Sequence, residues 1–441
     1  MGIFDLFGGK NKAAEAEAAA EKAALEKKEK EREELIKAHE DLTWPTAPRL
    51  NPVNVKDVEG ASFEDTVSDE KKDEIGPMIY EEDLSPESLK TLSNQELLFL
   101  LTAQEVYHKA SPLPEFEKNH RKVYNELLNR VRDSKILYVL YDGATGYPFI
   151  DHGFGNVYFE KELAERGAQL FSKQFRKLLV REIKVENEND PTGQKRGFFD
   201  YLYYIGIENL FVDNGAYRAR FKRNEIVAAP GDWNAEASKD NAPVNPGLSF
   251  AMLDFLGELR WPVNYEKRAE VLKAKEMRML SLVRSSQFIV PMQHEGPVEV
   301  LEDGKMKFNK DTKIRFLVMK TPDDKQYLPI FTDMIEFSKK PQDEVWNAAV
   351  FTYQDILKFV ADKDGIRINP HGQQIIIPKD KMMLLEMAGH QADVMNKKKG
   401  AGRPVSAANQ SEEAMVKKAL DQAMTRLNEK RNEEEFEEPK E

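Results

Sequence analysis

The chain has 441 residues, with 65 Lys and Arg against 77 Asp and Glu, so its formal net charge is −12. A net acidic protein is repelled by phosphate backbones and anionic lipid, which argues against a general nucleic-acid binder or electrostatic membrane attachment. Cysteine is absent, which excludes disulfides, thiolate metal sites and cysteine nucleophiles and suits a reducing, cytoplasmic compartment. No apolar run approaches the roughly 18 residues that a membrane-spanning helix needs.

The first ten residues hold a short apolar cluster of Ile3, Phe4, Leu6 and Phe7. This cluster is either a peptide that docks on a membrane surface or in a partner's groove, or a frayed terminus that packs on its own protein or on nothing. Residues 13–40 are rich in Ala, Glu and Lys, which are strong helix formers, but have too few large aliphatic residues for a coiled-coil seam. We therefore expect a solvated helical spacer there. The proline-containing stretch 44–77 is predicted to be a linker.

Ser93 and Glu96 form a capping-box pattern ahead of a strongly apolar run, which predicts a helix packed on the first domain. Residues 116–131 have apolar side chains three and four positions apart, which indicates a second helix with one buried face. The β-rich run 136–141 then predicts a strand. Further on, the pair Asn214-Gly215 suits a two-residue hairpin turn.

The segment 198–204 contains five aromatic residues among seven. Strand alternation would place Phe199, Tyr201 and Tyr203 on one face. We predict a central strand with two apolar faces, or alternatively an edge strand whose aromatic face binds a protein partner.

Several sequence fragments recur in the same order in the two halves of the middle region, which indicates a tandem duplication. Residues 135–140 resemble 313–318, Phe171 to Gln174 resembles Phe351 to Gln354, and Gly206-Ile207 resembles Gly365-Ile366. Gly215 is matched with Gly372. The change in offset predicts an insertion of about twenty residues in the first copy, between residues 181 and 206.

The second copy has its own helix over 272–283 and strands at 288–291 and 314–319. Residues 320–325 form a predicted turn between 314–319 and 327–332, because proline followed by two aspartates suits a tight reversal. Thr352 with Asp355 predicts the start of a helix. A last hairpin spans residues 368–375. Strands, a helix and a hairpin in each copy predict an α+β fold class: two tandem related mixed α/β domains with largely antiparallel sheets, flanked by charged helical or disordered arms.

The second copy resembles the N-terminal domain of the bacterial SseB family (enhanced serine sensitivity proteins). The resemblance covers about residues 263–378 and rests on Tyr327-Leu-Pro-Ile-Phe-Thr-Asp333, Glu336-Phe337, Trp346 and Gly365-Ile-Arg-Ile-Asn-Pro-His-Gly372. The first copy, about 116–223, resembles the family only as a divergent version. The resemblance implies a cytoplasmic bacterial protein with no established enzymatic reaction and no cofactor.

The resulting division of the chain is a charged arm and linker over 1–83, a divergent SseB-like domain over 84–228 and a linker over 229–247. An SseB-like domain over 248–395 follows. Residues 396–441 are predicted to be a linker, a short helix with Met415, Leu420, Met424 and Leu427 on its apolar face, and an acidic tail.

Candidate site residues are few. Asp333 follows a strand end and is either a ligand contact or a turn residue that accepts backbone N–H bonds. Asn369, His371 and Gly372 are either turn residues or part of the same binding surface. Asp151 and His152 are adjacent, but neighbours on a strand point to opposite faces, so we expect that they do not meet.

No phosphate-binding loop, zinc-protease motif or calcium loop occurs in the sequence, and the seven histidines are scattered. We therefore expect no catalytic residue, no metal and no cofactor. The leading hypothesis is a non-enzymatic protein-interaction or scaffold role with a protein partner. The alternative is a small-molecule sensor or enzyme with a pocket near Asp333 and His371 or between the two domains.

Overall fold

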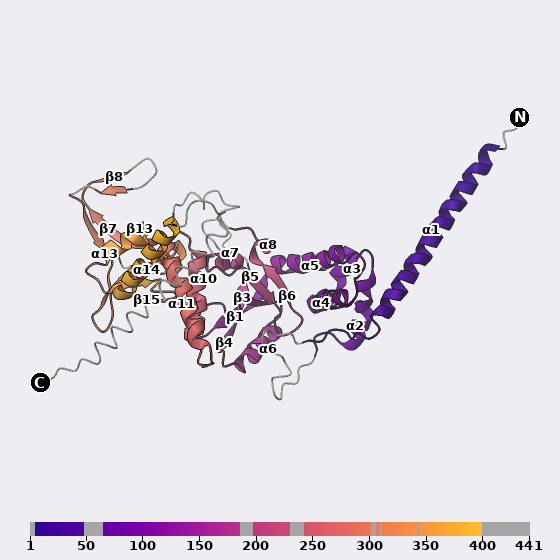
Figure 1. Cartoon of the computed structure of the whole chain (residues 1–441), viewed down its shortest axis with the longest axis horizontal. Helices are drawn as coiled ribbons and strands as arrows, with labels where there is room; N and C mark the ends of the chain where they lie inside the picture. The colour runs from indigo at the N-terminus through magenta and orange to yellow at the C-terminus, as the bar shows by residue number, and fades with distance from the viewer. Residues whose placement is uncertain are drawn as a thin grey trace.

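The structure is a computed structural model, and it describes residues 5–47, 65–185, 197–229, 242–300, 306–308, 311–341 and 344–398. Two mixed α/β units follow one another along the chain, and a long helix, α1 (Asp5–Ala38), extends away from the first of them (Figure 1). We call residues 116–226 the first unit and residues 268–398 the second unit. None of the helices in the described parts is both long and apolar enough to cross a membrane.

The arm is helical, as its composition predicts, and it is anchored near its carboxyl end. His39 follows α1 and is buried, with Nδ1 3.2 Å from the Tyr80 hydroxyl and Nε2 3.1 Å from the Tyr107 carbonyl oxygen. Leu35 packs against the apolar cluster that contains Tyr80 and Tyr107. Ile3 and Phe4 lie outside the described residues, while Leu6 and Phe7 fall within the first turns of α1.

The predicted linker over 44–77 is wrong in its second half, because that half contains α2 (Asp69–Ile75) and the 3₁₀ helix η2 (Gly76–Tyr80). The Trp44 ring stacks on Tyr107 with centroids 4.8 Å apart, and it lies so close to Gly76 that a Cβ there would collide with it. Aromatic packing therefore holds Trp44 against η2 and Tyr107.

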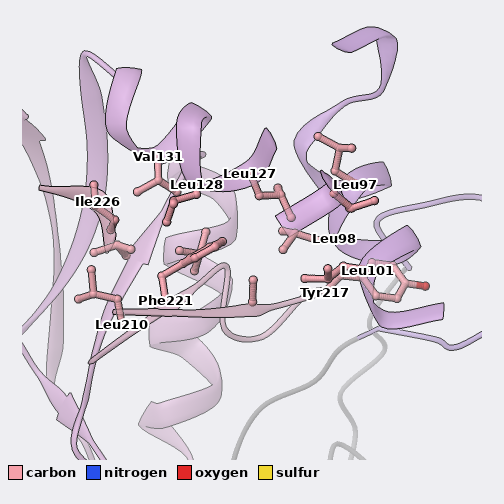
Figure 2. Packing of buried hydrophobic residues seen from close by; sticks show 14 of the residues in the cluster. Leu97, Leu98, Leu101, Leu127, Leu128, Val131, Leu210, Tyr217, Phe221 and Ile226 are labelled. Carbon is pink, nitrogen blue, oxygen red and sulfur yellow. The ribbon is translucent and has the colours of Figure 1, made fainter. Parts of the chain in front are cut away.

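Helices cover one face of the first sheet. α3 (Pro86–Thr91) precedes α4 (Asn94–Ala110), whose capping box at Ser93 and Glu96 is confirmed. α4 packs against α5 (Phe116–Asp133), and Figure 2 shows Leu98 lying among side chains of both helices and of the sheet. The helices predicted from apolar spacing therefore form a buried layer on the first unit, and α6 (Lys161–Ser172) covers the opposite face.

The strands of the first unit are β1 (Ile136–Asp142), β2 (Ile150–Asp151), β3 (Phe154–Tyr158), β4 (Leu178–Lys184), β5 (Asn209–Val212) and β6 (Ala219–Lys222). The sheet order is β4-β1-β3-β5-β6, with β2 paired to β3. Only β3 and β5 pair in parallel. Along β1, Leu137 and Val139 face the α4–α5 layer and Leu140 faces α6, as strand alternation requires.

The aromatic segment is a helix, α7 (Phe198–Tyr204), so the predicted strand is wrong. Strand propensity is overridden because a helix turns Phe198, Phe199 and Leu202 toward one buried side, while Tyr201 and Tyr203 remain partly exposed. The Asn214-Gly215 hairpin turn is also wrong in length: β5 and β6 are joined by residues 213–218, and α8 (Arg223–Ile226) follows.

The second unit begins with α11 (Arg268–Ser285) and ends with α14 (Lys379–Lys398). Between them lie β7 (Gln287–Glu295), β8 (Val298–Val300), β9 (Met306–Phe308), β10 (Lys313–Phe316), β11 (Met319–Lys320), β12 (Gln326–Ile330), α12 (Met334–Ser338), β13 (Asn347–Thr352), α13 (Tyr353–Phe359), β14 (Gly365–Ile368) and β15 (Ile375–Pro378). The predicted helix cap at Thr352 is confirmed. The predicted linker, helix and tail after residue 398 lie outside the described residues.

Strand pairing in the second unit follows the same plan as in the first. β7 pairs with β13, β12 pairs in parallel with β14, and β14 pairs with β15. A backbone bridge between Ile289 and Phe331 joins β7 to β12. β1 and β7 therefore occupy the same place in the strand order, and the predicted match of residues 135–140 with 313–318 is wrong.

The predicted match of residues 171–174 with 351–354 is also wrong, because Phe171 lies in α6 whereas Phe351 lies on the strand β13. The second unit carries its own addition, the hairpin β8–β9, between β7 and β10. A single insertion in the first copy therefore does not describe how the two halves differ.

One helix joins the two units. α10 (Pro246–Leu259) begins at the end of the predicted 229–247 linker, of which residues 230–241 lie outside the described part. Leu253 belongs to the apolar core of the first unit, whereas Met252 and Leu256 belong to the core of the second. α10 is thus shared by both cores, and it positions the surfaces that meet at the junction.

Candidate functional site at the junction of the two units

Asp333, one of the predicted site residues, caps a helix. Its Oδ1 accepts a hydrogen bond of 2.9 Å from the Glu336 backbone N–H at the start of α12, and Oδ2 accepts one of 2.8 Å from the Thr332 hydroxyl. The side chain is buried. These bonds correspond to the turn interpretation of Asp333 and leave the carboxylate facing its own backbone.

Glu336, on the first turn of α12, is the buried charge at this junction and is 4% exposed. Its Oε1 accepts hydrogen bonds from Lys339 Nζ at 2.6 Å and from the Tyr147 hydroxyl of the first unit at 3.3 Å. Its Oε2 has no hydrogen-bond partner and lies against Gly372, where a Cβ would collide with it. Burial raises the pKa of Glu336, and the positive charge of Lys339 opposes this shift.

The remaining predicted residues divide between this junction and other places. Asn369 is buried with φ +47°; its Oδ1 accepts a 3.0 Å bond from the Thr332 N–H and its Nδ2 donates to the Thr332 hydroxyl. Tyr201 lies on α7 and is partly exposed, and burial raises the pKa of its hydroxyl, with the charge of Glu336 acting in the same direction. The structure thus gathers Asp333, Asn369 and Gly372.

Three further predicted residues also do not join that cluster. Phe199 is buried in the core of the first unit, and Tyr203 lies beneath Arg223, with Cζ 5.1 Å from the ring centroid. The side chain of His371 is largely exposed. The part of the imidazole that is buried lowers its pKa. Most of the predicted residues therefore make turn or packing contacts within one unit, and the Tyr147–Glu336 hydrogen bond crosses between the units beside Gly372.

A cavity of about 890 Å³ lies elsewhere at the junction, between the first unit and the helices α10 and α11. The β2–β3 turn contributes Asp151 and His152, the loop before β4 contributes Arg176, and the end of α10 leads to Trp261. Ile150, Phe250 and Val271 add apolar surface. A volume of this size is typical of small-molecule sites.

Asp151 and His152 do meet, so the expectation that they would not was wrong. His152 has φ +50° and Gly153 has φ +89°, which are the left-handed conformations of a two-residue hairpin turn. The turn brings His152 Nδ1 to 2.7 Å from Asp151 Oδ1. A His-Gly pair between two strands was the signal that could have placed this contact.

The Asp151 carboxylate is only 5% exposed, and its Oδ2 has no hydrogen-bond partner. Burial raises the pKa of Asp151, whereas hydrogen bonding to His152 and the positive charges of Arg218 and Arg176 act in the opposite direction. Asp151 lines the cavity, and its Oδ2, which has no partner among the described residues, has the capacity to accept one further hydrogen bond or ion pair.

Arg176 is held in the same cavity by aromatic packing. Its Cζ lies 3.9 Å from the Trp261 ring centroid, and Nη1 donates a 2.9 Å bond to the Gly257 carbonyl oxygen. The Trp261 indole N–H in turn donates to the Gln174 carbonyl oxygen at 2.8 Å. Burial lowers the pKa of the guanidinium. Sequence patterning missed both residues, since they come together only when the loop before β4 meets the end of α10.

The charges on α10 and α11 compensate one another. Lys275 Nζ lies 2.9 Å from Asp254 Oδ1 and 3.3 Å from Glu258 Oε2, and the Tyr265 hydroxyl donates to Glu258 Oε1 at 2.9 Å. The described lining contains no serine, threonine or cysteine that the Asp151–His152 pair could activate as a nucleophile. Among the described residues, no group of three His, Asp or Glu is placed to hold a metal ion.

Comparison with known proteins identifies one part of the chain. The family model of the SseB protein N-terminal domain matches residues 266–382, which span α11 to the start of α14 and do not reach the first unit. No curated protein and no solved structure matches the chain. Residues 266–382 therefore form an SseB-family domain, as the motifs of the second copy indicated.

Proposed function

We propose that the protein is a non-catalytic sensor that binds a small polar molecule in the cavity between its two units. The observation that carries this proposal is the unpartnered oxygen of buried Asp151 in a cavity of about 890 Å³. A buried polar atom without a partner is costly, and a bound ligand that donates to it would recover that free energy. Among the described lining residues there is no serine, threonine or cysteine that the Asp151–His152 pair could activate, which supports binding rather than group transfer.

The position of the cavity supports a signalling role. One segment of the first unit connects the two junction sites: Tyr147 bonds to Glu336, and Phe149, Ile150 and Asp151 line the cavity. A ligand that binds more tightly to one arrangement of the units than to another would shift the population toward it.

The test is a thermal-shift screen of small polar compounds with two substituted proteins. Val271→Trp fills the cavity, and Val345→Trp places the same bulk on a residue that is 85% exposed. We expect at least one compound to raise the melting temperature of the wild type and Val345→Trp but not of Val271→Trp. Flat melting curves for every compound, or a shift that persists in Val271→Trp, would contradict the proposal.

A second candidate is a scaffold that binds a protein partner without a ligand. The edge strand β4 favours it, because Leu179 is 51% exposed there and Phe175, just before the strand, is 69% exposed. An extended peptide can pair with such an edge and cover its apolar side chains. Affinity capture with the wild type and a Phe175→Ser, Leu179→Ser double variant tests this role, and a partner retained equally by both would argue against β4.

We also infer that the first unit is a divergent copy of the SseB-type unit. The corresponding strand pairings and the single parallel pair among the named strands of each unit support this relationship. A profile built from residues 116–226 should then match SseB domains more strongly than other α/β folds, and an equal score against unrelated folds would contradict common ancestry.

A further inference from the structure

We propose that the cavity ligand is a zwitterion with a compact charged head, whose ammonium group pairs with Asp151 and whose carboxylate pairs with Arg176. This inference rests on the proposed function, because it names the chemical class of the molecule that the cavity binds. It is drawn from the two charged groups that the cavity leaves available and from the apolar surface beside them.

Asp151 specifies the cationic end. Its Oδ1 is occupied by His152 at 2.7 Å, while its Oδ2 is buried without a partner. A buried carboxylate is stable when a cation or several donors compensate the lost hydration. An ammonium group carries one positive charge and three donors, so it can serve Oδ2 and still bond to a second acceptor.

Arg176 specifies the anionic end. One face of the guanidinium lies on Trp261, and one of its five donors is used by the Gly257 carbonyl oxygen. Stacking fixes the plane of the group and leaves donors at its edge, which is the geometry that binds a carboxylate through two parallel hydrogen bonds.

The other cations of the lining serve different partners. Lys275 is paired with Asp254 and Glu258, and the Arg278 guanidinium lies over the Phe250 ring with Cζ 5.4 Å from its centroid. Arg176 and Asp151 line the same cavity as Phe250 and Val271. A ligand in this cavity can therefore meet both charged groups and place a partly apolar body beside Phe250 and Val271.

Three probes that share a phenyl group but differ in their charged groups separate the contributions of the ammonium and the carboxylate to binding. Phenylalanine has both charges, phenethylamine lacks the carboxylate, and 3-phenylpropionate lacks the ammonium group. Titration of the full-length protein by calorimetry, or by NMR for weak binding, should give phenylalanine at least tenfold higher affinity than either analogue. Equal affinity of all three would overturn the zwitterion, since the aromatic body alone would then account for binding.

Charge-removing variants assign each end. Asp151→Asn should weaken the binding of phenylalanine and phenethylamine at least tenfold and leave that of 3-phenylpropionate unchanged. Arg176→Gln should weaken the binding of phenylalanine and 3-phenylpropionate at least tenfold and leave that of phenethylamine unchanged. Arg278→Gln is the matched control, and loss of carboxylate binding in that variant instead would overturn the assignment to Arg176.

The outcomes also separate this inference from the proposed function. If none of the three probes binds, but another compound stabilises the wild type and not Val271→Trp, the cavity is a ligand site and the zwitterion is wrong. If no compound stabilises the wild type, both proposals fail.

Discussion

The two units share a strand order but differ in the residue that begins the loop between their last two strands. In the first unit, Asp213 has φ +55°, its Oδ1 accepts from the Phe159 N–H and its own N–H donates to the Val157 carbonyl oxygen. In the second, Asn369 makes the corresponding bonds to Thr332 and Ile330. The fold thus requires a short side chain that tolerates the left-handed conformation and accepts one backbone bond, and both residue types provide it.

The difference lies in the charge. Asp213 is fully buried, and its Oδ2 accepts a 2.7 Å bond from the side chain of Gln95 on α4. The first unit therefore retains an ionisable group where the second has a neutral amide, and a helix outside the sheet supplies its second donor. Stability of the first unit should consequently depend on its helical layer and on pH.

The largest effect is expected from the helical layer. Leu98 on α4 is fully buried among α4, α5 and the sheet (Figure 2), so Leu98→Ala should lower the free energy of unfolding by about 4 kcal/mol through lost burial and a cavity. Urea denaturation followed by circular dichroism measures this. Val350→Ala, on an exposed position of β13, should change it by less than about 0.5 kcal/mol, and similar losses in both variants would contradict the assigned core.

The next largest loss of stability is expected from a substitution at the junction between the first unit and α10. Gly206 has φ +74°, and a Cβ there would collide with the Pro246 carbonyl oxygen and with Phe250, both of which belong to α10. Gly206→Ala should therefore cost about 3 kcal/mol, from left-handed strain and overpacking together.

Gly146→Ala is the matched control, since Gly146 has φ +78° and open space around its missing Cβ. It should cost about 1 kcal/mol, from backbone strain alone. Equal losses in the two glycine variants, by the same urea assay, would show that α10 does not pack against Gly206.

A pH-dependent effect tests the charge difference between Asp213 and Asn369. Burial raises the pKa of Asp213 to about 7, well above the usual value for an aspartate. Between pH 4 and 7 the unfolded chain therefore releases a proton that the folded chain keeps, and the free energy of unfolding falls as pH rises, by at most about 1.4 kcal/mol per pH unit.

Asp213→Asn should remove this contribution. The stability difference between variant and wild type should grow in favour of the variant from pH 4 to 7 and level off above pH 7. Asp324→Asn, at an exposed turn of the second unit that also has positive φ, is the control and should leave the slope unchanged. Parallel pH profiles for wild type and Asp213→Asn would contradict the raised pKa.

Features set by local sequence could be predicted. Apolar spacing and caps gave α4, α5 and α13, because their signals lie within one turn of each end. The SseB-family domain is identifiable because several separate motifs between residues 327 and 372 agree with the family, and they lie inside the matched range. The aromatic segment 198–204 was not predictable as α7, since its burial depends on α8 and α10, which contact it in the folded chain.

The candidate site was less predictable than the fold. Asp333 and Asn369 stood out in the sequence but hold turns together. Arg176 belongs to the first unit and Trp261 follows α10, so the two residues are far apart in the sequence and meet only through tertiary packing. The expectation that Asp151 and His152 do not meet is wrong because it places both residues on a strand. The chain instead makes a tight turn at His152, which the following Gly153 permits.

The most direct test of the account is an NMR titration that follows methyl groups while phenylalanine is added. Ile150 and Val271 line the cavity, whereas Val345 and Ile376 are exposed on the second unit. We predict saturable shifts at Ile150 and Val271 that Val271→Trp abolishes at Ile150, with Val345 and Ile376 unmoved. Shifts absent from the cavity methyls, or spread equally over all four residues, would contradict the binding of a zwitterion of this kind at the junction.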